Sequence, residues 1–332
     1  MRRLFNPGKD SPMTIGSRAL VDPELGPMLD LFPSVGVSAE LLPVLRQPGR
    51  FTFPPAGPEG AKVRLEKPFV PGPEGAPDVG VWVYTPPEAS PPRPCILHIH
   101  GGGYVMGDVG SQEPVHRNMA AALGCVIVSV DYRLAPETVF PGAVEDGYAA
   151  LAWVFANASA LGVDPARIGV MGESAGGGLA ASLALLARDR GEHVLAFQHL
   201  IYPMIDDRTC VAADPHPHAG EFIWTAASNL FGWRSILGVE PGSEGVSPYA
   251  AASRAEDVSG LPATFMSTGA LDLFLEEDLE YARRLMRAGV PVELHVYPGA
   301  FHAFNVHPTA EVSVQARRDS TAALVRAMKR RG

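Results

Sequence analysis

The sequence lacks three features that would mark particular classes of protein: paired cysteines, long apolar runs and an excess of basic residues. Its cysteines, Cys95, Cys125 and Cys210, lie far apart with no CxxC pair, which argues against a disulfide framework and against a zinc site. No apolar stretch approaches the roughly 18 residues of a membrane-spanning helix, and residues 6–10 interrupt any signal-peptide core. We therefore expect a cytoplasmic protein with no integral membrane association.

Basic residues are in deficit, with 27 Lys and Arg against 36 Asp and Glu and a net charge of -9. Nucleic acids and anionic membranes are bound by clustered basic side chains, so neither is expected as a partner. The 332 residues, of which 46% are hydrophobic, are enough for one large α/β domain or two small ones with a sizeable core. A small neutral molecule remains a suitable partner.

Apolar runs of strand length alternate with helical patterns along most of the chain. The runs are near-continuous, which is typical of strands buried on both faces, and they occupy residues 95–100, 125–130, 168–171, 197–204, 263–268 and 292–297. Helical patterns separate them at about 112–123, 143–158, 175–189 and 276–288. This rhythm predicts an α/β fold with a mostly parallel central sheet and helices on both faces.

Two regions depart from the rhythm. Short apolar pieces at residues 25–32 and 39–45 predict N-terminal helices, and residues 62–70 and 79–84 predict antiparallel strands at the sheet edge. No strand signal follows between Ile205 and Ser247. That insertion carries an amphipathic stretch with aromatic side chains, as a lid over one edge of the sheet would.

Residues 172–176 read Gly-Glu-Ser-Ala-Gly, a G-x-S-x-G motif between an apolar strand and a helical pattern. This context suits a strained strand-to-helix turn that holds the hydroxyl of Ser174 exposed as a nucleophile. A glycine-rich turn with a serine helix cap would give the same motif without any chemistry.

A second glycine motif supports the chemical interpretation. His100 and the glycines 101–103 end an earlier strand, where backbone N–H groups can point at one oxygen. Gly102, Gly103 and Ala175 are the predicted oxyanion donors, and His100 is interpreted as a side chain that orients this loop. A phosphate-binding nest is the alternative, but no Lys follows the glycines as in a P-loop.

Acid and base candidates each follow a later predicted strand. Asp272 and His302 complete the chain order Ser, Asp, His with Ser174. Asp272 can instead cap the next helix, which would leave Glu276 or Asp278 as the acid.

The remaining histidines have simpler explanations as structural or surface residues. His216 and His218 form an H-x-H pair in a loop, which is a weak metal signal on its own. We predict no metal and no cofactor.

Taken together, these motifs resemble those of the bacterial hormone-sensitive-lipase-like esterases, the family IV lipolytic enzymes of the α/β-hydrolase superfamily. The resemblance extends over roughly residues 62–330 and rests on five motifs in order: His100 to Gly103, Asp131 to Glu137, Phe140-Pro141, Gly172 to Gly177 and Phe301 to Phe304. Two departures are present. Glu173 replaces the usual Asp, and Leu273 stands where Pro often follows the acid.

This resemblance implies an α/β-hydrolase fold with a helical cap and the same triad and oxyanion residues. Cap helices are expected in residues 1–60, a cap insertion in 206–245, and the catalytic domain in 61–205 and 246–332. Tyr104, Trp224 and Phe304 are the predicted substrate-binding residues.

The predicted function is a serine carboxylesterase that hydrolyses short- to medium-chain esters through an acyl-enzyme, as a monomer or homodimer. An amidase or carbamate hydrolase would use the same residues. A ligand-binding homologue without turnover is the alternative outside enzymes, although such proteins usually lack part of the triad.

Overall fold

The computed structural model describes residues 16–31, 36–47, 53–87 and 90–329. The strands are β1 (Arg64–Glu66), β2 (Phe69–Val70), β3 (Val79–Thr85), β4 (Arg93–Ile99), β5 (Val126–Asp131), β6 (Val163–Glu173), β7 (Phe197–Ile201), β8 (Ala263–Gly269) and β9 (Val292–Tyr297). The α-helices are α1 (Gly26–Leu31), α2 (Leu42–Leu45), α3 (Pro58–Ala61), α4 (Glu113–Leu123), α5 (Gly142–Ala156), α6 (Ala158–Leu161), α7 (Ala175–Arg190), α8 (Ala226–Leu237), α9 (Leu275–Arg287) and α10 (Glu311–Lys329).

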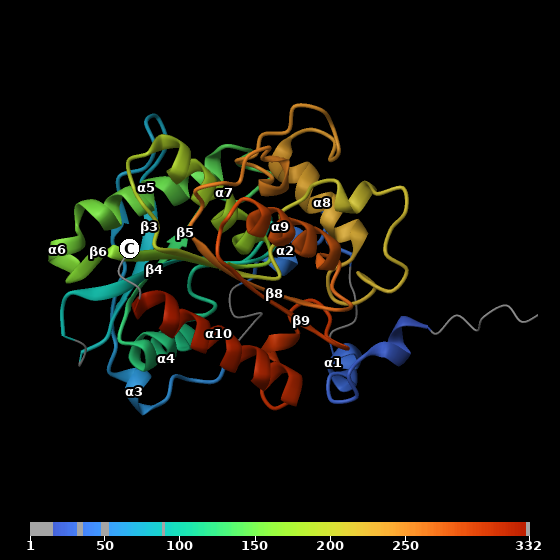
Figure 1. The fold of residues 1–332 in the computed structure, drawn as a ribbon, viewed down its shortest axis with the longest axis horizontal. Coiled ribbons are helices and arrows are strands. Elements are labelled where there is room, and N and C mark those ends of the chain that lie inside the picture. The colour runs from blue at the N-terminus through green and yellow to red at the C-terminus, as the bar shows by residue number, and fades with distance from the viewer. Residues whose placement is uncertain (1–15, 32–35, 48–52, 88–89, 330–332) are drawn as a thin grey trace, which may run out of the picture.

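All strands join one sheet in the order β1-β3-β5-β4-β6-β7-β8-β9, with β2 paired to β3 (Figure 1). Strands β4 to β9 pair in parallel, whereas β1, β2 and β3 pair antiparallel. The predicted fold class and the antiparallel start of the sheet are confirmed. Strand β3 is not an edge strand, however, because it lies between β1 and β5.

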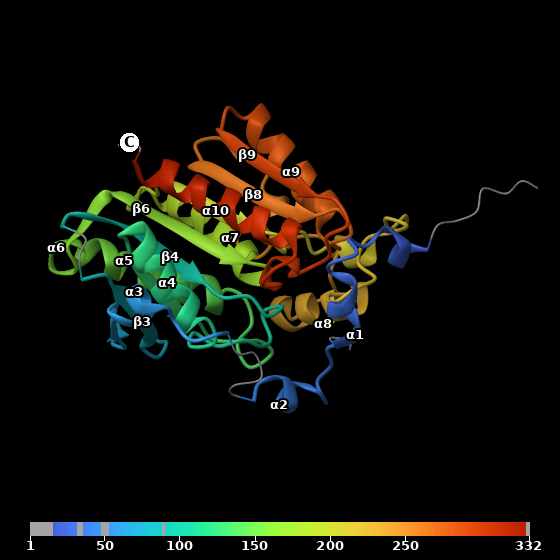
Figure 2. The same cartoon turned by 90° about the horizontal axis from the view of Figure 1, so that it is seen from below.

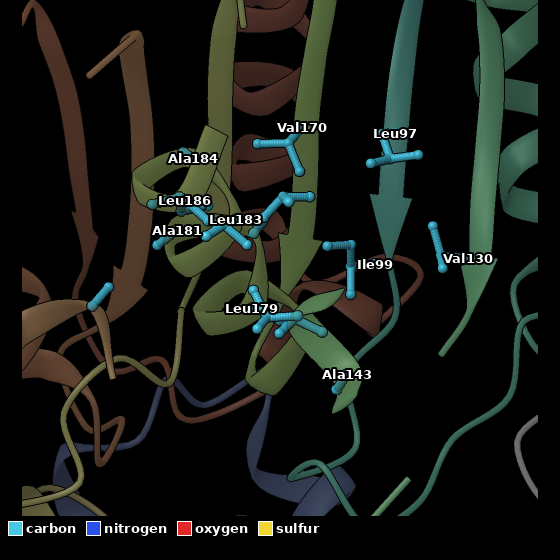
Figure 3. Close-up of a cluster of buried hydrophobic side chains, with 14 of the residues drawn as sticks. Leu97, Ile99, Val130, Ala143, Val170, Leu179, Ala181, Leu183, Ala184 and Leu186 are labelled. Carbon is cyan, nitrogen blue, oxygen red and sulfur yellow. The ribbon is translucent and has the colours of Figure 1, made fainter. Parts of the chain in front are cut away.

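Helices cover both faces of the sheet. Helices α5, α7 and α9 contribute buried side chains to one apolar cluster, and α1, α4 and α10 contribute to a second. Figure 3 shows part of the first cluster, to which β4 contributes Leu97 and Ile99, β6 contributes Val170, and α7 contributes Leu179 and Leu183. Because these strands are buried on both faces, their sequences are near-continuously apolar.

Some elements differ from the sequence prediction. Helix α10 was missed, since its buried positions are widely spaced among charged residues and several are small, such as Ala316 and Ala323. The amphipathic stretch of the insertion extends from about residue 221 to residue 237. Helix α8 begins only at Ala226, because Thr225 caps it by accepting a hydrogen bond from the amide of Ser228. Residue 32, the end of the first predicted helix, lies outside the described residues.

Helices α1, α2 and α8 gather at one end of the sheet, the end toward which the parallel strands run (Figure 2). The cap was expected at this end of the sheet. The boundaries given above for the cap and the catalytic domain remain a prediction. Within the ranges described, no helix combines the length and apolar content that a bilayer span requires.

His199 provides a test of the packing between the sheet and α10. Its ring stacks on Phe265 at 4.2 Å and its Nε2 lies 2.8 Å from the Ser320 hydroxyl of α10. Burial lowers the pKa of His199 from 6.5 to about 3. As the pH falls below about 6.5, His199 binds a proton in the unfolded chain but stays neutral in the folded chain. The free energy of unfolding therefore falls as the pH is lowered.

We expect His199→Gln to reduce this acid sensitivity. The difference in the free energy of unfolding, wild type minus variant, should fall by up to about 1.4 kcal/mol for each pH unit below 6.5. Urea unfolding at pH 7.5, 6.5 and 5.5 measures it, with His193→Gln as a partly exposed control. An advantage that grows toward low pH would contradict the assignment.

Candidate functional site

Ser174 sits in a sharp turn between β6 and α7. Its φ of 56° and ψ of -125° lie outside the usual regions for a side-chain-bearing residue, so the surrounding backbone must hold it there. The Ser174 amide donates to the Ile201 carbonyl, and its carbonyl accepts from the Met204 amide, both at 2.9 Å. Gly176 allows α7 to approach β4, because a Cβ there would lie 2.1 Å from the Ile99 carbonyl oxygen.

The three residues predicted to act together meet at this turn. His302 Nε2 lies 2.9 Å from Ser174 Oγ, and His302 Nδ1 lies 2.9 Å from Asp272 Oδ2. Ser174, Asp272 and His302 are 7%, 0% and 5% exposed. The hydroxyl, imidazole and carboxylate thus form one hydrogen-bonded chain that is almost shielded from water.

Asp272 makes contacts that suit both roles suggested by its sequence position, a partner of the histidine and a helix cap. One carboxylate oxygen faces His302, and the other accepts from the Phe274 amide at the start of α9. The rival acid Asp278 is fully buried, and burial beside Glu277 and Asp272 raises the pKa of its carboxyl well above the usual range. A carboxyl that holds its proton is poorly suited to stabilise an imidazolium.

Aromatic rings enclose the imidazole. Tyr202 and Phe274 contact it edge-on, with centroid separations of 4.8 Å and 5.1 Å, and the Trp224 ring lies 6.3 Å away. Tyr202 and Phe274 were not identified from the sequence, because each lies within or beside an apolar stretch that predicts only packing. Their contacts restrict the orientation of the His302 ring.

The loop of residues 100–107, here called the glycine loop, passes beside the turn. A Cβ on Gly101 would lie 3.3 Å from the Ser174 Cβ. Gly102 and Gly103 have φ values of 125° and 61°. In the part of the chain that is described, their amides donate to no protein acceptor, and the Ala175 amide lies in the first turn of α7, where helical N–H groups are left unpaired.

His100 supports this loop from within. It is 2% exposed, its Nδ1 lies 2.9 Å from the Gly101 carbonyl, and its ring stacks on Tyr132 at 4.4 Å. The Tyr132 hydroxyl donates to the His100 carbonyl. Burial lowers the pKa of His100 to about 4, so a neutral ring is present at pH 7.

No group of three or more His, Cys, Asp or Glu side chains is arranged to hold a metal ion in the described segments. His216 belongs to the H-x-H pair that was considered for a metal. Its Nδ1 accepts hydrogen bonds from the amides of His218 and Ala219 and thereby stabilises its own turn.

A family model described as the alpha/beta hydrolase fold matches residues 96–306, well over half of the chain. This matched region contains the turn, the glycine loop and both partners of Ser174. The chain belongs to the hormone-sensitive-lipase-like esterases of the α/β-hydrolase family.

Its relatives include the carboxylesterase NlhH of Mycobacterium tuberculosis, which is 36% identical over 316 residues covering 94% of this chain and 98% of that protein. Esterase LipI of the same species is 32% identical, covering 88% of this chain and 90% of its own length. Among solved structures, a bacterial heroin esterase superposes with a TM-score of 0.86 at 38% identity, covering 95% of this chain and all of that one. The predicted family and the assignment to carboxylic ester hydrolases are thereby confirmed.

Glu173, one departure from the family motif, has a defined partner in this esterase. Its carboxylate lies 3.0 Å from His98 Nε2, and His98 Nδ1 lies 3.0 Å from the Ser129 hydroxyl. The longer side chain therefore links the turn at Ser174 to β4 and β5. His98 was not singled out in the sequence, because it lies inside an apolar run.

The three predicted substrate-binding residues lie in different surroundings. Trp224 covers the glycine loop, since a Cβ on Gly103 would lie 2.2 Å from its ring. Phe304, 1% exposed, packs against Tyr297 at 5.4 Å in the second apolar cluster, which is a packing position.

Tyr104 is also a packing residue in this esterase. It is 2% exposed, and its hydroxyl donates to the Met204 carbonyl at 2.9 Å. The Met204 amide in turn donates to the Ser174 carbonyl. Tyr104 thus connects the glycine loop to the turn at Ser174 through Met204.

We expect Tyr104→Phe to lower kcat severalfold and leave KM nearly unchanged, because it removes a bond that aligns two loops and no substrate contact. The free energy of unfolding should fall by about 1 to 3 kcal/mol, since the buried Met204 carbonyl loses its donor. Steady-state ester hydrolysis and urea unfolding measure both. Tyr148→Phe removes a hydroxyl bonded to Glu192 and serves as the control; a rise in KM alone would restore the substrate-binding interpretation of Tyr104.

Proposed function

We propose that this chain is a serine carboxylesterase in which Ser174 is the nucleophile, His302 the general base and acid, and Asp272 the group that orients the imidazole. The observation that carries the proposal is the hydrogen-bonded chain from Asp272 through His302 to the Ser174 hydroxyl. Membership of an esterase family supports the substrate class.

In the first half-reaction, Ser174 Oγ attacks the ester carbonyl carbon while His302 Nε2 accepts the hydroxyl proton. Asp272 stabilises the resulting imidazolium through Nδ1–H. The carbonyl oxygen gains a negative charge, and the amides of Gly102, Gly103 and Ala175 stabilise it by donating hydrogen bonds to that oxygen. The intermediate then expels the alcohol, which takes the proton from His302, and an acyl ester of Ser174 remains.

In the second half-reaction, water attacks the acyl carbon and gives a proton to His302. The tetrahedral oxygen again faces the three amides. The C–O bond to Ser174 breaks, Oγ recovers the proton, and the carboxylic acid leaves. These residues need no cofactor or metal for either step.

We further propose that short to medium acyl chains are preferred. The nucleophile is 7% exposed, and the Trp224 ring, held by a hydrogen bond from its Nε1 to Asn229, lies against Gly103 and beside His302. An enclosed aromatic wall limits the volume available to an acyl group. A cytoplasmic location and a monomeric or homodimeric state remain predictions.

Replacing Ser174 with Ala should remove nearly all turnover, because the proposed acyl ester forms on the Ser174 hydroxyl. We expect kcat for p-nitrophenyl butyrate to fall by about 10⁵- to 10⁶-fold, to a level set by binding and the remaining amides. Purified wild-type and variant proteins are compared at equal concentration and checked for folding by circular dichroism. Undiminished turnover by the variant would overturn the proposed function.

Trp224→Ala should shift the preferred acyl length upward, because the indole no longer bounds the space over Gly103. The ratio of kcat/KM for acetate to that for octanoate should fall by about tenfold. A series of p-nitrophenyl esters from acetate to palmitate measures this ratio. Trp224→Phe is the control, since a smaller ring should produce a smaller shift; an unchanged ratio in both variants would place the acyl group elsewhere.

A further inference from the structure

Residues 36–47 form a short segment that bridges two parts of the site. At its start, the Val37 amide donates to the Ser228 hydroxyl of α8 at 3.1 Å. In its middle, Leu42 of α2 is 6% exposed within the larger apolar cluster. At its end, Arg46 reaches the glycine loop.

Arg46 places its guanidinium against two backbone carbonyls. Nε donates to the Val105 carbonyl at 2.6 Å, and Nη2 donates to the Ala135 carbonyl at 2.7 Å. The same group pairs with Glu137, with Nη1 to Oε1 at 2.7 Å and Nη2 to Oε2 at 3.0 Å. A planar fork with fixed N–H directions can satisfy these acceptors together, which a single ammonium group cannot.

Both carbonyls belong to the support of the glycine loop. Val105 lies in the loop, and the Ala135 amide donates to the Tyr104 carbonyl at 2.9 Å. Arg46 therefore restrains residues 104–105 through the Val105 and Ala135 carbonyls. The Tyr104 hydroxyl restrains the same residues through its hydrogen bond to the Met204 carbonyl. The side chain of Arg46 is 25% exposed, so water competes only partly for these bonds.

Helix α8 packs on the glycine loop from the side opposite Arg46. A Cβ on Gly232 would lie 2.7 Å from the Gly103 carbonyl oxygen, so the helix backbone packs directly on the loop. Trp233 contacts the Tyr104 ring at 5.3 Å. The glycine loop is thus held between α8 and Arg46, and the segment 36–47 joins these two supports.

We propose that Arg46 is a positioning residue that aligns the glycine loop for oxyanion stabilisation and couples that alignment to the docking of segment 36–47 on α8. This inference rests on the proposed function, because it assumes that the loop amides donate hydrogen bonds to the oxygen on which negative charge develops. Misalignment by about 1 Å can cost as much as 10²-fold in rate, so a support of the loop affects turnover without touching substrate.

The test compares Arg46→Met and Arg46→Lys with the wild type. We expect both variants to lower kcat by about 10- to 100-fold while KM changes by less than about threefold. Lys retains the charge and can pair with Glu137, so it preserves the fold but loses the two carbonyl bonds. Arg18→Met is the control, since Arg18 forms an exposed ion pair with Asp30 in the neighbouring N-terminal segment.

A trifluoromethyl ketone provides the second measurement. Addition of the serine to this ketone creates a negatively charged oxygen, so its affinity should fall in the Arg46 variants by the same factor as kcat/KM. Unchanged kcat in Arg46→Lys, an increase in KM alone, or unchanged ketone affinity would each overturn the role of Arg46. If the wild type itself shows no Ser174-dependent ester hydrolysis, the proposed function fails instead, whatever the Arg46 variants do.

Discussion

The arrangement of the site depends on the hydrogen bond between the Ser174 hydroxyl and His302 Nε2. Its two ends are 128 residues apart in sequence, and the parallel sheet brings them together. Ser174 follows β6, Asp272 follows β8 and His302 follows β9, and parallel strands place their carboxyl ends at one edge. The strained backbone at Ser174 is tolerated because Ile201, the last residue of β7, and Met204, just beyond it, hold its amide and carbonyl.

Support for the glycine loop comes from several directions. Tyr132 and His100 hold its first residues, the Tyr104 hydroxyl anchors its centre, and Arg46 binds its outer side. Each contact ends on a backbone carbonyl. The carbonyls of His100, Gly101 and Val105 belong to the loop itself, so the bonds to them restrain the orientation of its peptide planes. Such preorganisation matters because donors that are already aligned need not reorient when charge develops.

Much of this arrangement could be predicted from sequence where a local pattern dictates geometry. The two-sided burial of the strands, the turn at Ser174 and the order of Asp272 and His302 all leave local signals. The direction of a single side chain leaves none, which is why Tyr104 and Phe304 were assigned to substrate although both are buried in packing positions. The contacts of Arg46 were missed for the same reason, because they join segments that are distant in sequence.

The most direct test of the central claim is covalent trapping. The protein is incubated with a fluorophosphonate, and the modified residue is located by peptide mass spectrometry. We predict one phosphonylated residue, Ser174, with labelling lost after denaturation because the alignment with His302 is lost. Labelling of another residue, or equal labelling of the folded and denatured chains, would contradict it.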